Sequence, residues 1–387
     1  MPVPILFAAS PRRAQAFVAR WRGCRPAFYC LLAHTDLCLV PGLSAAGVTA
    51  ELRPLTPAAD AEVVRHGRAT CLPTLPSSPL GAPGPAGITR AALSLAGVEA
   101  RFLGVGLRVW PGTACARVSD MPGGDIRRGS AVPNARDLFA AGLALGSRVE
   151  AGQAGLVLGE SVPGGTTTAL SLLLALGYAA EGRVSGSVLG NAHALKGRVA
   201  REAIAATGMT PSRARSDPLL AVSQVGDPMQ PLAAGLALGA MRAGHAVLLA
   251  GGSQMLAVAA LVLALAGPRA LERLAVGTTR WVTQDPSADV AGLAADISLD
   301  LPVLAANLDF SGSRHAGLRR YEESLVKEGV GAGGACIAAL LAGASLDALH
   351  ARIDATYDDL LGTLRAGDSP HRGGRESSAA AESQTHQ

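Results

Sequence analysis

Gly159-Glu160-Ser161-Val162-Pro163-Gly164-Gly165-Thr166-Thr167-Thr168 is the stretch that decides the fold. The apolar residues 154–158 before it predict a short buried strand, and residues 169–176 after it predict a helix that ends at Gly177. A carboxylate therefore stands at the end of a strand, and glycines and hydroxyls stand at the start of a helix. In an open α/β sheet, ligands bind at the carboxyl ends of strands, and the free N–H groups of a helix N-terminus attract phosphate.

Two other interpretations of this stretch are weaker. Gly159 and Gly164 have the spacing of a P-loop, but Gly165 stands where a P-loop has lysine. Without that cation the turn cannot neutralise a triphosphate, so a monophosphate or a sugar is favoured. A plain turn in which Thr166 caps the helix needs one hydroxyl and no glutamate, so we favour a binding site.

The pattern of strand, glycine turn and helix recurs twice. Residues 246–250 lead into Gly251-Gly252-Ser253-Gln254, and residues 303–308 lead into Phe310-Ser311-Gly312-Ser313. Three such units predict a doubly wound, mostly parallel, Rossmann-like α/β sheet with helices on both faces and with the turns at one edge. We therefore expect Ser311 and Ser313 to bind substrate together with the Gly251–Gln254 turn.

The rest of the chain divides into three parts. Residues 1–150 predict a smaller N-terminal α/β portion, with strands over 3–8, 27–32 and 101–109 and helices over 57–64 and 88–95. Its Pro-, Ser- and Gly-rich loop, residues 73–85, is long enough to suggest a function. We expect residues 151–365 to form the nucleotide-binding catalytic core. No break in composition marks the boundary near residue 150, so its position is approximate. Residues 366–387 are polar without apolar periodicity, which predicts a disordered tail.

Composition excludes several classes of protein. The chain has 387 residues, of which 49% are hydrophobic and 3% aromatic, with a formal net charge of +4. No basic block with interleaved aromatics indicates nucleic-acid binding, and the most apolar segment, residues 246–266, is interrupted by the Gly251–Gln254 turn, which argues against a membrane span. The six cysteines form no CxxC pair and the eight histidines no HxxxH, so we expect free thiols and no metal.

The first 35 residues contain five arginines and no acid, which is also a feature of transit peptides. The prolines at positions 2 and 4 and the apolar residues 5–8 fit a first strand better. We therefore expect a cytoplasmic protein.

Lysine is rare in this chain. Of 34 basic residues only Lys196 and Lys327 are lysines, and the others are arginines. Lys196 leads into a predicted helix that extends to residue 206, and either Lys196 or Arg198 is suited to hold a phosphate. Charges on a solvated helix face are the alternative.

A second carboxylate stands in Lys327-Glu328-Gly329-Val330-Gly331-Ala332-Gly333-Gly334, before a predicted helix over residues 335–342. Gly329, Gly331 and Gly334 satisfy GxGxxG, which leaves open an NAD(P)-dependent oxidoreductase, but no apolar strand leads into the run. We interpret it as a turn that lets substrate approach the backbone, with Glu328 presented beside it, and we expect Lys327, Gly329 and Gly331 to bind substrate. A first-turn acid favoured by the helix dipole is the alternative for Glu328.

Together these motifs resemble the nicotinate-nucleotide–dimethylbenzimidazole phosphoribosyltransferase family, most closely its archaeal and cyanobacterial-type branch. The likeness runs from about Gly124 to Leu341, and the order of the two glutamate motifs is its specific part. It implies a transferase of cobalamin lower-ligand assembly. A benzimidazole-type base displaces nicotinate from nicotinate mononucleotide to give α-ribazole phosphate, with no metal or other cofactor. The resemblance also implies a homodimer.

The resemblance also implies roles for individual residues. Glu328 matches the general base, and Glu160 matches the second acid of the site. The turn Gly164-Gly165-Thr166-Thr167 matches the nucleotide-binding loop, and Lys196 lies near the lysine that contacts phosphate. Lys327 stands where the better-studied bacterial branch has glycine. A protein that binds a nucleotide without turning it over remains a third hypothesis, which the presence of both glutamates disfavours.

Overall fold

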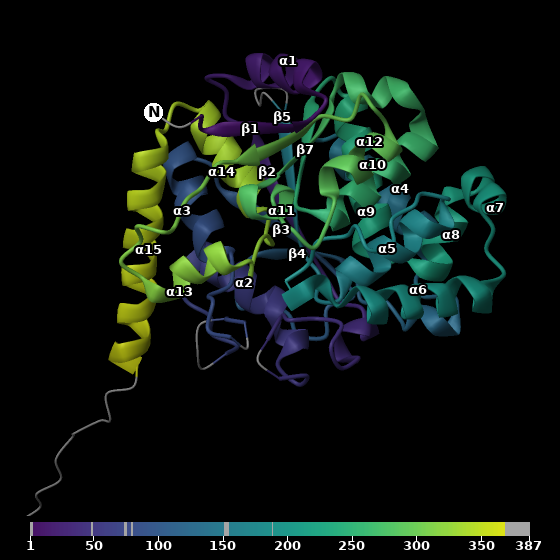
Figure 1. Ribbon diagram of the computed structural model, residues 1–387, viewed down its shortest axis with the longest axis horizontal. Helices are drawn as coiled ribbons and strands as arrows, with labels where there is room; N and C mark the ends of the chain where they lie inside the picture. The colour runs from purple at the N-terminus through teal and green to yellow at the C-terminus, as the bar shows by residue number, and fades with distance from the viewer. Residues whose placement is uncertain are drawn as a thin grey trace, which may run out of the picture.

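One eight-stranded sheet runs through the molecule (Figure 1). The structure is a computed structural model, and it describes residues 3–47, 49–72, 76–78, 80–150, 155–187 and 189–367. The strand order is β1-β8-β7-β6-β5-β2-β3-β4. Among the described strands β1 alone is antiparallel to its neighbour, β8. The strands are β1 (Ile5–Ala9), β2 (Ala27–Ala33), β3 (Ala100–Val105), β4 (Cys115–Ser119), β5 (Gly155–Ser161), β6 (Ala246–Ala250), β7 (Leu274–Thr279) and β8 (Val303–Ala306).

Helices cover both faces of the sheet. Successive side chains of β5 alternate between two cores: Leu156 and Leu158 belong to one, and Val157 belongs to the other. The first core is completed by α4 (Ala135–Gly146), α5 (Gly165–Ala175), α6 (His193–Thr207), α7 (Pro211–Ser216), α8 (Pro218–Val225), α9 (Met229–Arg242), α10 (Ser253–Ala266) and α12 (Val290–Ile297). The second is completed by α1 (Pro11–Trp21), α2 (Thr56–His66), α3 (Ala86–Ala96), α14 (Ala332–Leu341) and α15 (Leu346–Gly367).

This arrangement explains the apolar strands. Every residue of β5, β6, β7 and β8 is buried. A parallel sheet with helices on both faces needs near-continuous apolar strands, because neither face meets water. The predicted doubly wound α/β fold is therefore confirmed.

Glycines allow one pair of helices, α4 and α9, to pack closely. A Cβ at Gly142 of α4 would meet the backbone of α9, and a Cβ at Gly235 of α9 would meet the backbone of α4. The distance between two packed helix axes depends on the side chains at their contact. The Ala- and Gly-rich composition therefore allows these helices to pack unusually close.

The predicted elements differ from the observed ones mainly at their ends. Strand β5 extends to Ser161 and so includes Glu160, and α5 begins at Gly165, earlier than expected. The strands β4 and β7 were not predicted. Strands from both sides of residue 150 are neighbours, since β2 pairs with β5, so the proposed division there does not separate two sheets. Of the expected tail, residues 366–367 end α15 and residues 368–387 lie outside the described residues.

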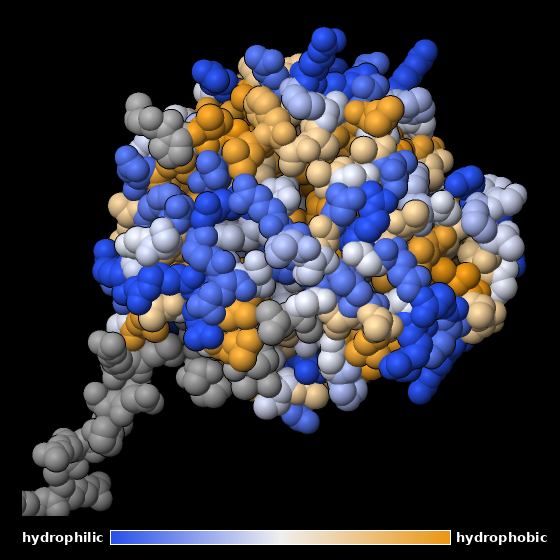
Figure 2. Space-filling view, viewed as in Figure 1, coloured by the Kyte–Doolittle hydropathy of each residue, from blue (hydrophilic) through white to orange (hydrophobic). Residues whose placement is uncertain are grey.

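Within the described ranges, no helix is both long and apolar enough to cross a lipid bilayer. Figure 2 shows polar and apolar side chains interspersed over one face of the molecule.

Candidate active site

The strand order reverses between β2 and β5. From β2 the chain moves outward to β3 and β4, returns to β5, and then proceeds in the opposite direction through β6 and β7 to β8. Ligands of open α/β sheets bind at such a switch point, at the carboxyl ends of the strands. Glu160 and Ser161 are the last two residues of β5, so the structure places Glu160 at this point.

Two adjoining cavities open there. They share Glu160, Thr166, Ser187, Gln254 and Glu328. The α2 cavity extends toward α2 and the loops before and after it, and its other lining residues include Leu43, Thr56, Asp60, Ser77, Ser78, Pro85, Ser161, Gly164, Lys196, Val326 and Gly329. The α10 cavity extends toward the start of α10, and its other lining residues are Ser185, Gly186, Gly252, Ser253, Val282 and Lys327.

Glu328 lies at the N-terminus of α14. Its carboxylate accepts hydrogen bonds from the backbone N–H of Gly333 (3.1 Å) and Gly329 (3.1 Å) and from Thr278 Oγ1 (3.3 Å). Burial raises the pKa of Glu328 to about 7, against the effect of these hydrogen bonds. Glu328 thus interacts with the first turn of α14, as expected for an acid that is favoured by the helix dipole. It also lines both cavities, where it is a group that titrates near neutrality.

Glu160 is 3% exposed and is the second carboxyl shared by the cavities. Burial, and next the charge of Glu328, raise its pKa to about 8. The carbonyl oxygen of Glu160 accepts a hydrogen bond from the N–H of Val330 (2.8 Å), which ties the two glutamate motifs together. Perturbed carboxyl pairs of this kind in a cleft are typical of catalytic sites.

The glycine run beside Glu328 packs against the sheet. A Cβ at Gly331 would lie 2.9 Å from the Cα of Gly159 and 3.2 Å from the Cβ of Ala250, and Gly331 has φ 67°. Val330, a β-branched residue, also has a positive φ of 55°, a conformation that is strained for such a residue. The run therefore brings α14 close to the strand ends. Gly329 lines the α2 cavity, where a substrate could approach the run, whereas Gly331 lines neither cavity, so the expectation that Gly331 binds substrate is not supported. The run has no strand before it, unlike a dinucleotide fingerprint.

The start of α5 faces both cavities through Thr166. Gly164, with φ 87°, precedes the helix, and no side chain of the described residues caps it, so Thr166 does not serve as the cap. Gly165 packs so closely against Gln254 that a Cβ there would overlap the amide. Thr167 is buried within the helix and lines neither cavity. In the first turn of α5 the N–H groups of Gly165 and Thr167 donate to the carbonyls of Val162 (2.9 Å) and Gly164 (3.0 Å), which leaves the N–H of Thr166 to face the cavities.

The two candidate phosphate cations lie in different surroundings. Lys196 is 1% exposed and lines the α2 cavity, and a Cβ at Gly186 would meet both Lys196 Nζ (2.8 Å) and Thr166 Oγ1 (3.1 Å). Burial, and next the charge of Lys327, lower the pKa of Lys196 to about 8. The Arg198 side chain is 64% exposed and pairs with Glu202 on the outer face of α6. Lys196 is therefore the cation placed to contact a ligand.

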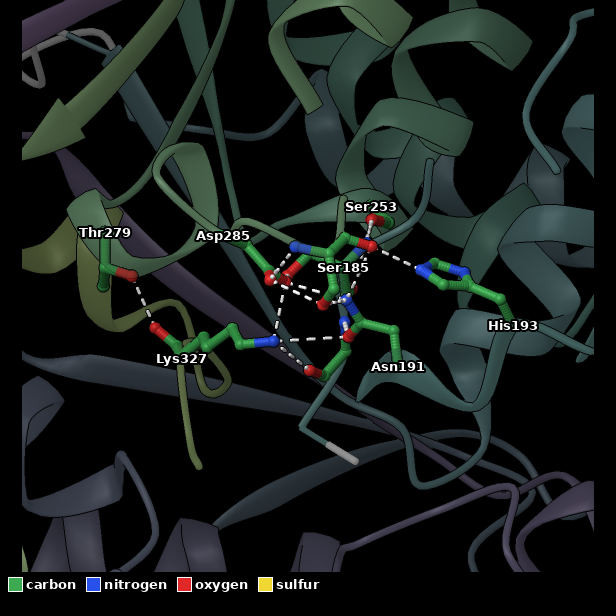
Figure 3. Close-up of polar contacts among 9 residues, drawn as sticks. Ser185, Asn191, His193, Ser253, Thr279, Asp285 and Lys327 are labelled. Carbon is green, nitrogen blue, oxygen red and sulfur yellow. Dashed lines mark hydrogen bonds and ion pairs between the residues drawn. The ribbon is translucent and has the colours of Figure 1, made fainter. Parts of the chain in front are cut away.

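Lys327 points into a buried polar network that includes Asp285, Asn191 and Ser185 (Figure 3). Its Nζ donates to Asp285 Oδ2 (2.6 Å), to the carbonyl oxygen of Gly186 (3.0 Å) and to Asn191 Oδ1 (3.3 Å). Asp285 also accepts hydrogen bonds from Ser185 Oγ (2.7 Å) and Asn191 Nδ2 (2.8 Å). Burial acts to raise the pKa of Asp285, but these hydrogen bonds hold it well below its usual range. The network anchors the segment before α6 to the turn that carries Glu328.

The two remaining predicted turns differ. Gly252, Ser253 and Gln254 line the α10 cavity, Gly251 lies beside Glu160, and the Oε1 atom of Gln254 is buried without a hydrogen-bond partner among the described residues. Ser311 and Ser313 line neither cavity, and Ser313 Oγ instead donates to Asp354 of α15 (2.5 Å). The expectation that they bind substrate is therefore not supported, because β7 lies between β6 and β8 and its end supplies Thr278 instead.

Several functional candidates were missed in the sequence. Asp60, Ser187 and Thr278 come from a helix, a loop and an unpredicted strand end, and carry no motif. The Pro- and Ser-rich loop, by contrast, contributes Ser77, Ser78 and Pro85 to the α2 cavity, as its length suggested. Within the described residues, no three His, Cys, Asp or Glu side chains gather as a metal site would require.

Comparisons with known proteins place this geometry in context. No family model matches the chain. A crystal structure of nicotinate-nucleotide–dimethylbenzimidazole phosphoribosyltransferase from Thermus thermophilus is similar, with a TM-score of 0.58, 20% identity, and coverage of 89% of this chain and 91% of that one. A crystal structure of CobT from the same organism has a TM-score of 0.55, 22% identity, and coverage of 92% and 91%. The resemblance seen in the sequence is thus confirmed at the level of the fold.

Relatives at higher identity carry a family name. A UPF0284 protein of Gloeobacter violaceus is 44% identical over 363 residues, which cover 92% of this chain and 93% of that protein. A UPF0284 protein of Methanothermobacter thermautotrophicus is 39% identical over 337 residues, with coverage of 86% and 93%. At this identity and coverage, the chain belongs to the UPF0284 family.

Proposed function

We propose that the protein is a phosphoribosyltransferase of cobalamin lower-ligand assembly. It transfers the phosphoribosyl group of nicotinate mononucleotide to a benzimidazole-type base and gives α-ribazole phosphate and nicotinate. The observation that carries the proposal is the pair of buried carboxyls, Glu160 and Glu328, which face shared cavities at the switch point of the sheet. The fold of the Thermus thermophilus phosphoribosyltransferase supports it.

The two carboxyls have the chemistry that this transfer needs. A ring nitrogen of the incoming base attacks C1′ of the ribose with its lone pair, while the bond from C1′ to the pyridine nitrogen breaks and nicotinate leaves with that electron pair. Positive charge develops on the ribose, and Glu160 stabilises it in its ionised form, which its pKa of about 8 makes the smaller fraction at neutral pH. The proton of the base's other ring nitrogen passes to the carboxylate of Glu328, whose pKa near 7 suits a general base.

The phosphate of the donor binds at the start of α5. The backbone N–H and the hydroxyl of Thr166, in the uncapped first turn, provide hydrogen-bond donors. Lys196 provides the cation, since its Nζ lies near Thr166 and forms no hydrogen bond or ion pair with another described residue. Ser187, Ser253 and Gln254 line the neighbouring α10 cavity and are placed to contact the ribose.

The protein acts as a homodimer in the cytoplasm and uses no cofactor. An NAD(P)-dependent oxidoreductase is disfavoured, because no strand leads into the glycine run and Gly331 packs against β5 and β6. A binding protein without catalysis is disfavoured because the binding of an anion does not need two carboxyls that titrate near neutrality.

Mass spectrometry of the reaction products tests the proposal. The protein is incubated with nicotinate mononucleotide and a panel of heteroaromatic bases. The expected product has the mass of the base plus ribose phosphate less one water, with one nicotinate released per product. A Glu160→Gln/Glu328→Gln double variant is the control and should form none. Binding of NAD without any mononucleotide-dependent product would overturn the proposal.

A further inference from the structure

A third carboxyl, Asp60 of α2, lines the α2 cavity but has no role in the transfer described above. It is 4% exposed. Among the described residues its one hydrogen bond is donated by Ser161 Oγ to Oδ2 (2.7 Å), so Oδ1 is left without a partner. Because Ser161 directly follows Glu160 on β5, this contact holds Asp60 at the edge of the reaction site.

Other buried acids of the protein are satisfied by the protein itself. Glu62, two residues further along α2, accepts three backbone hydrogen bonds, from Thr70 (2.5 Å), Cys71 (3.0 Å) and Gly112 (2.7 Å). Asp227 accepts from Thr168 Oγ1 (2.5 Å), Met229 N (3.0 Å) and Gln230 N (3.3 Å). A buried carboxyl with one neutral donor is costly for the free protein. Asp60 therefore differs from these structural acids in having an oxygen available to a ligand.

The surroundings of Asp60 fit a flat heterocycle with a polar edge. Leu43, Pro85 and Val326 give the α2 cavity apolar walls, and Glu328 lines the same cavity. Asp60 does not line the α10 cavity, where Ser253 and Lys327 lie. Thr56 and Ser77, which carry hydroxyl groups, also line this cavity. Burial raises the pKa of Asp60 to about 7, so a substantial fraction is ionised at neutral pH.

We propose that Asp60 is a specificity residue that accepts a hydrogen bond from an amino or hydroxyl substituent of the acceptor base, at the edge away from the nitrogen that attacks the ribose. This inference rests on the proposed phosphoribosyl transfer. It predicts that the accepted base is a polar-substituted benzimidazole-type heterocycle, rather than one with methyl groups alone. A site built to hydrogen-bond a polar group rejects an apolar analogue, because its own buried group is then left unpaired.

The test compares 5-aminobenzimidazole with 5,6-dimethylbenzimidazole, by calorimetry without donor and by steady-state kinetics with donor. For the wild type we expect the amino compound to bind about 10- to 100-fold more tightly, as a charge-assisted hydrogen bond implies. Asp60→Ala should remove this preference by raising KM for the amino compound, while kcat at saturating base and KM for nicotinate mononucleotide stay within about 3-fold. Asp227→Asn is the matched control, which loses another buried acid and should keep the preference.

Each outcome decides one question. A wild type without the preference, or an Asp60→Ala variant that retains it, overturns the inference. If Asp60→Ala does not fold by circular dichroism, Asp60→Asn keeps the size of the side chain and should show a reduced preference. If the bases bind with a preference that depends on Asp60 but no ribosylated product forms, the proposed phosphoribosyl transfer is wrong and the proposed role of Asp60 in binding the base is retained. If product forms with equal efficiency from both bases, the recognition by Asp60 fails alone.

Discussion

Lys327 Nζ lies 2.6 Å from Asp285 Oδ2, and both side chains are almost fully buried. Lys327 is therefore paired with Asp285 rather than with Glu328, its neighbour in the chain. This pairing leaves burial as the main influence on the pKa of Glu328, which rises to about 7. Lys327, at the position where the bacterial branch has glycine, thus connects its own segment to that of Asp285, which lies 42 residues earlier in the chain.

Removal of that anchor should destabilise the protein. Lys327→Met leaves Asp285 as a buried charge without its ion-pair partner, and we expect a loss of about 3 kcal/mol in the free energy of unfolding. Urea denaturation followed by circular dichroism measures it. The double variant Lys327→Met/Asp285→Asn should recover part of the loss, because no unpaired charge remains. A single variant as stable as the wild type would show that the ion pair contributes nothing.

Glu328→Gln should reduce kcat by about 10²–10⁴-fold, because the amide keeps the shape of the carboxylate but does not accept a proton. Affinity for the donor should stay within a few-fold. In the wild type the rate should fall as the pH drops below about 7, since Glu328 must be ionised to act as a base. This acidic limb should be absent from the residual rate of the variant. Normal turnover by Glu328→Gln together with an inactive Glu160→Gln would reverse the two roles.

The features that were predictable from sequence are those set by local pattern. The glycine turns after β5 and β6, the helix start at α5 and the two glutamate motifs each occupy one short stretch, and the structure brings them to shared cavities. The mostly parallel sheet follows from the repeated strand–turn–helix unit. The position of each of these units within the sheet does not follow from the repeat. The turn after β8 has the same local pattern, yet β7 separates it from β6, and Ser313 contacts α15 instead.

The features that were missed depend on contacts between distant segments. Ser161 bonds Asp60 across 101 residues, and Thr278 bonds Glu328 across 50. No spacing rule links such pairs, because α2 and β7 reach the site only through the topology of the whole sheet. The choice between Lys196 and Arg198 likewise depends on which face of α6 packs inward, and the sequence does not reveal this because the buried face itself carries Lys196 among small and apolar residues.

The ligand-free protein should be less stable at pH 8 than at pH 5. Glu160 has a pKa of about 8 when folded against about 4.5 when unfolded, so between these values the unfolded chain releases a proton that the folded protein keeps. The stability contributed by the protonated carboxyl is complete below pH 4.5 and is lost as the pH rises through 8. Thermal unfolding should show Tm falling by roughly 5 °C or more over this range, and falling less in Glu160→Gln. An identical pH dependence in the variant would contradict the assignment.

The protein should be a homodimer. Large apolar side chains are exposed on and near the edge strand β1, with Phe7 38%, Val3 62% and Leu299 83% exposed. Exposed apolar surface of this kind often marks an interface between copies. Light scattering at micromolar concentration should give twice the chain mass of 39.0 kDa. A monomeric mass at that concentration would count against the dimer.

Lys196→Ala should weaken the binding of nicotinate mononucleotide by about 1–3 kcal/mol, the range for a charge-assisted hydrogen bond. Binding of the base should be unaffected, because Lys196 is assigned to the phosphate. Nicotinate, which lacks the phosphate, should bind the variant and the wild type equally. Calorimetry with each ligand separates these effects. The affinity of the wild type for the mononucleotide should also decline above pH 8, since burial lowers the pKa of Lys196 to about 8 and the cation is progressively lost.

Arg198→Ala is the matched control for this experiment. It removes a positive charge two residues away on the same helix, but its side chain is 64% exposed and pairs with Glu202 in water. Exposed pairs of this kind contribute little to stability or to a distant site, so donor affinity should stay within about 2-fold. If Arg198→Ala weakens donor binding and Lys196→Ala does not, the phosphate is held from the outer face of α6. If neither variant changes the affinity, the first turn of α5 holds the phosphate alone.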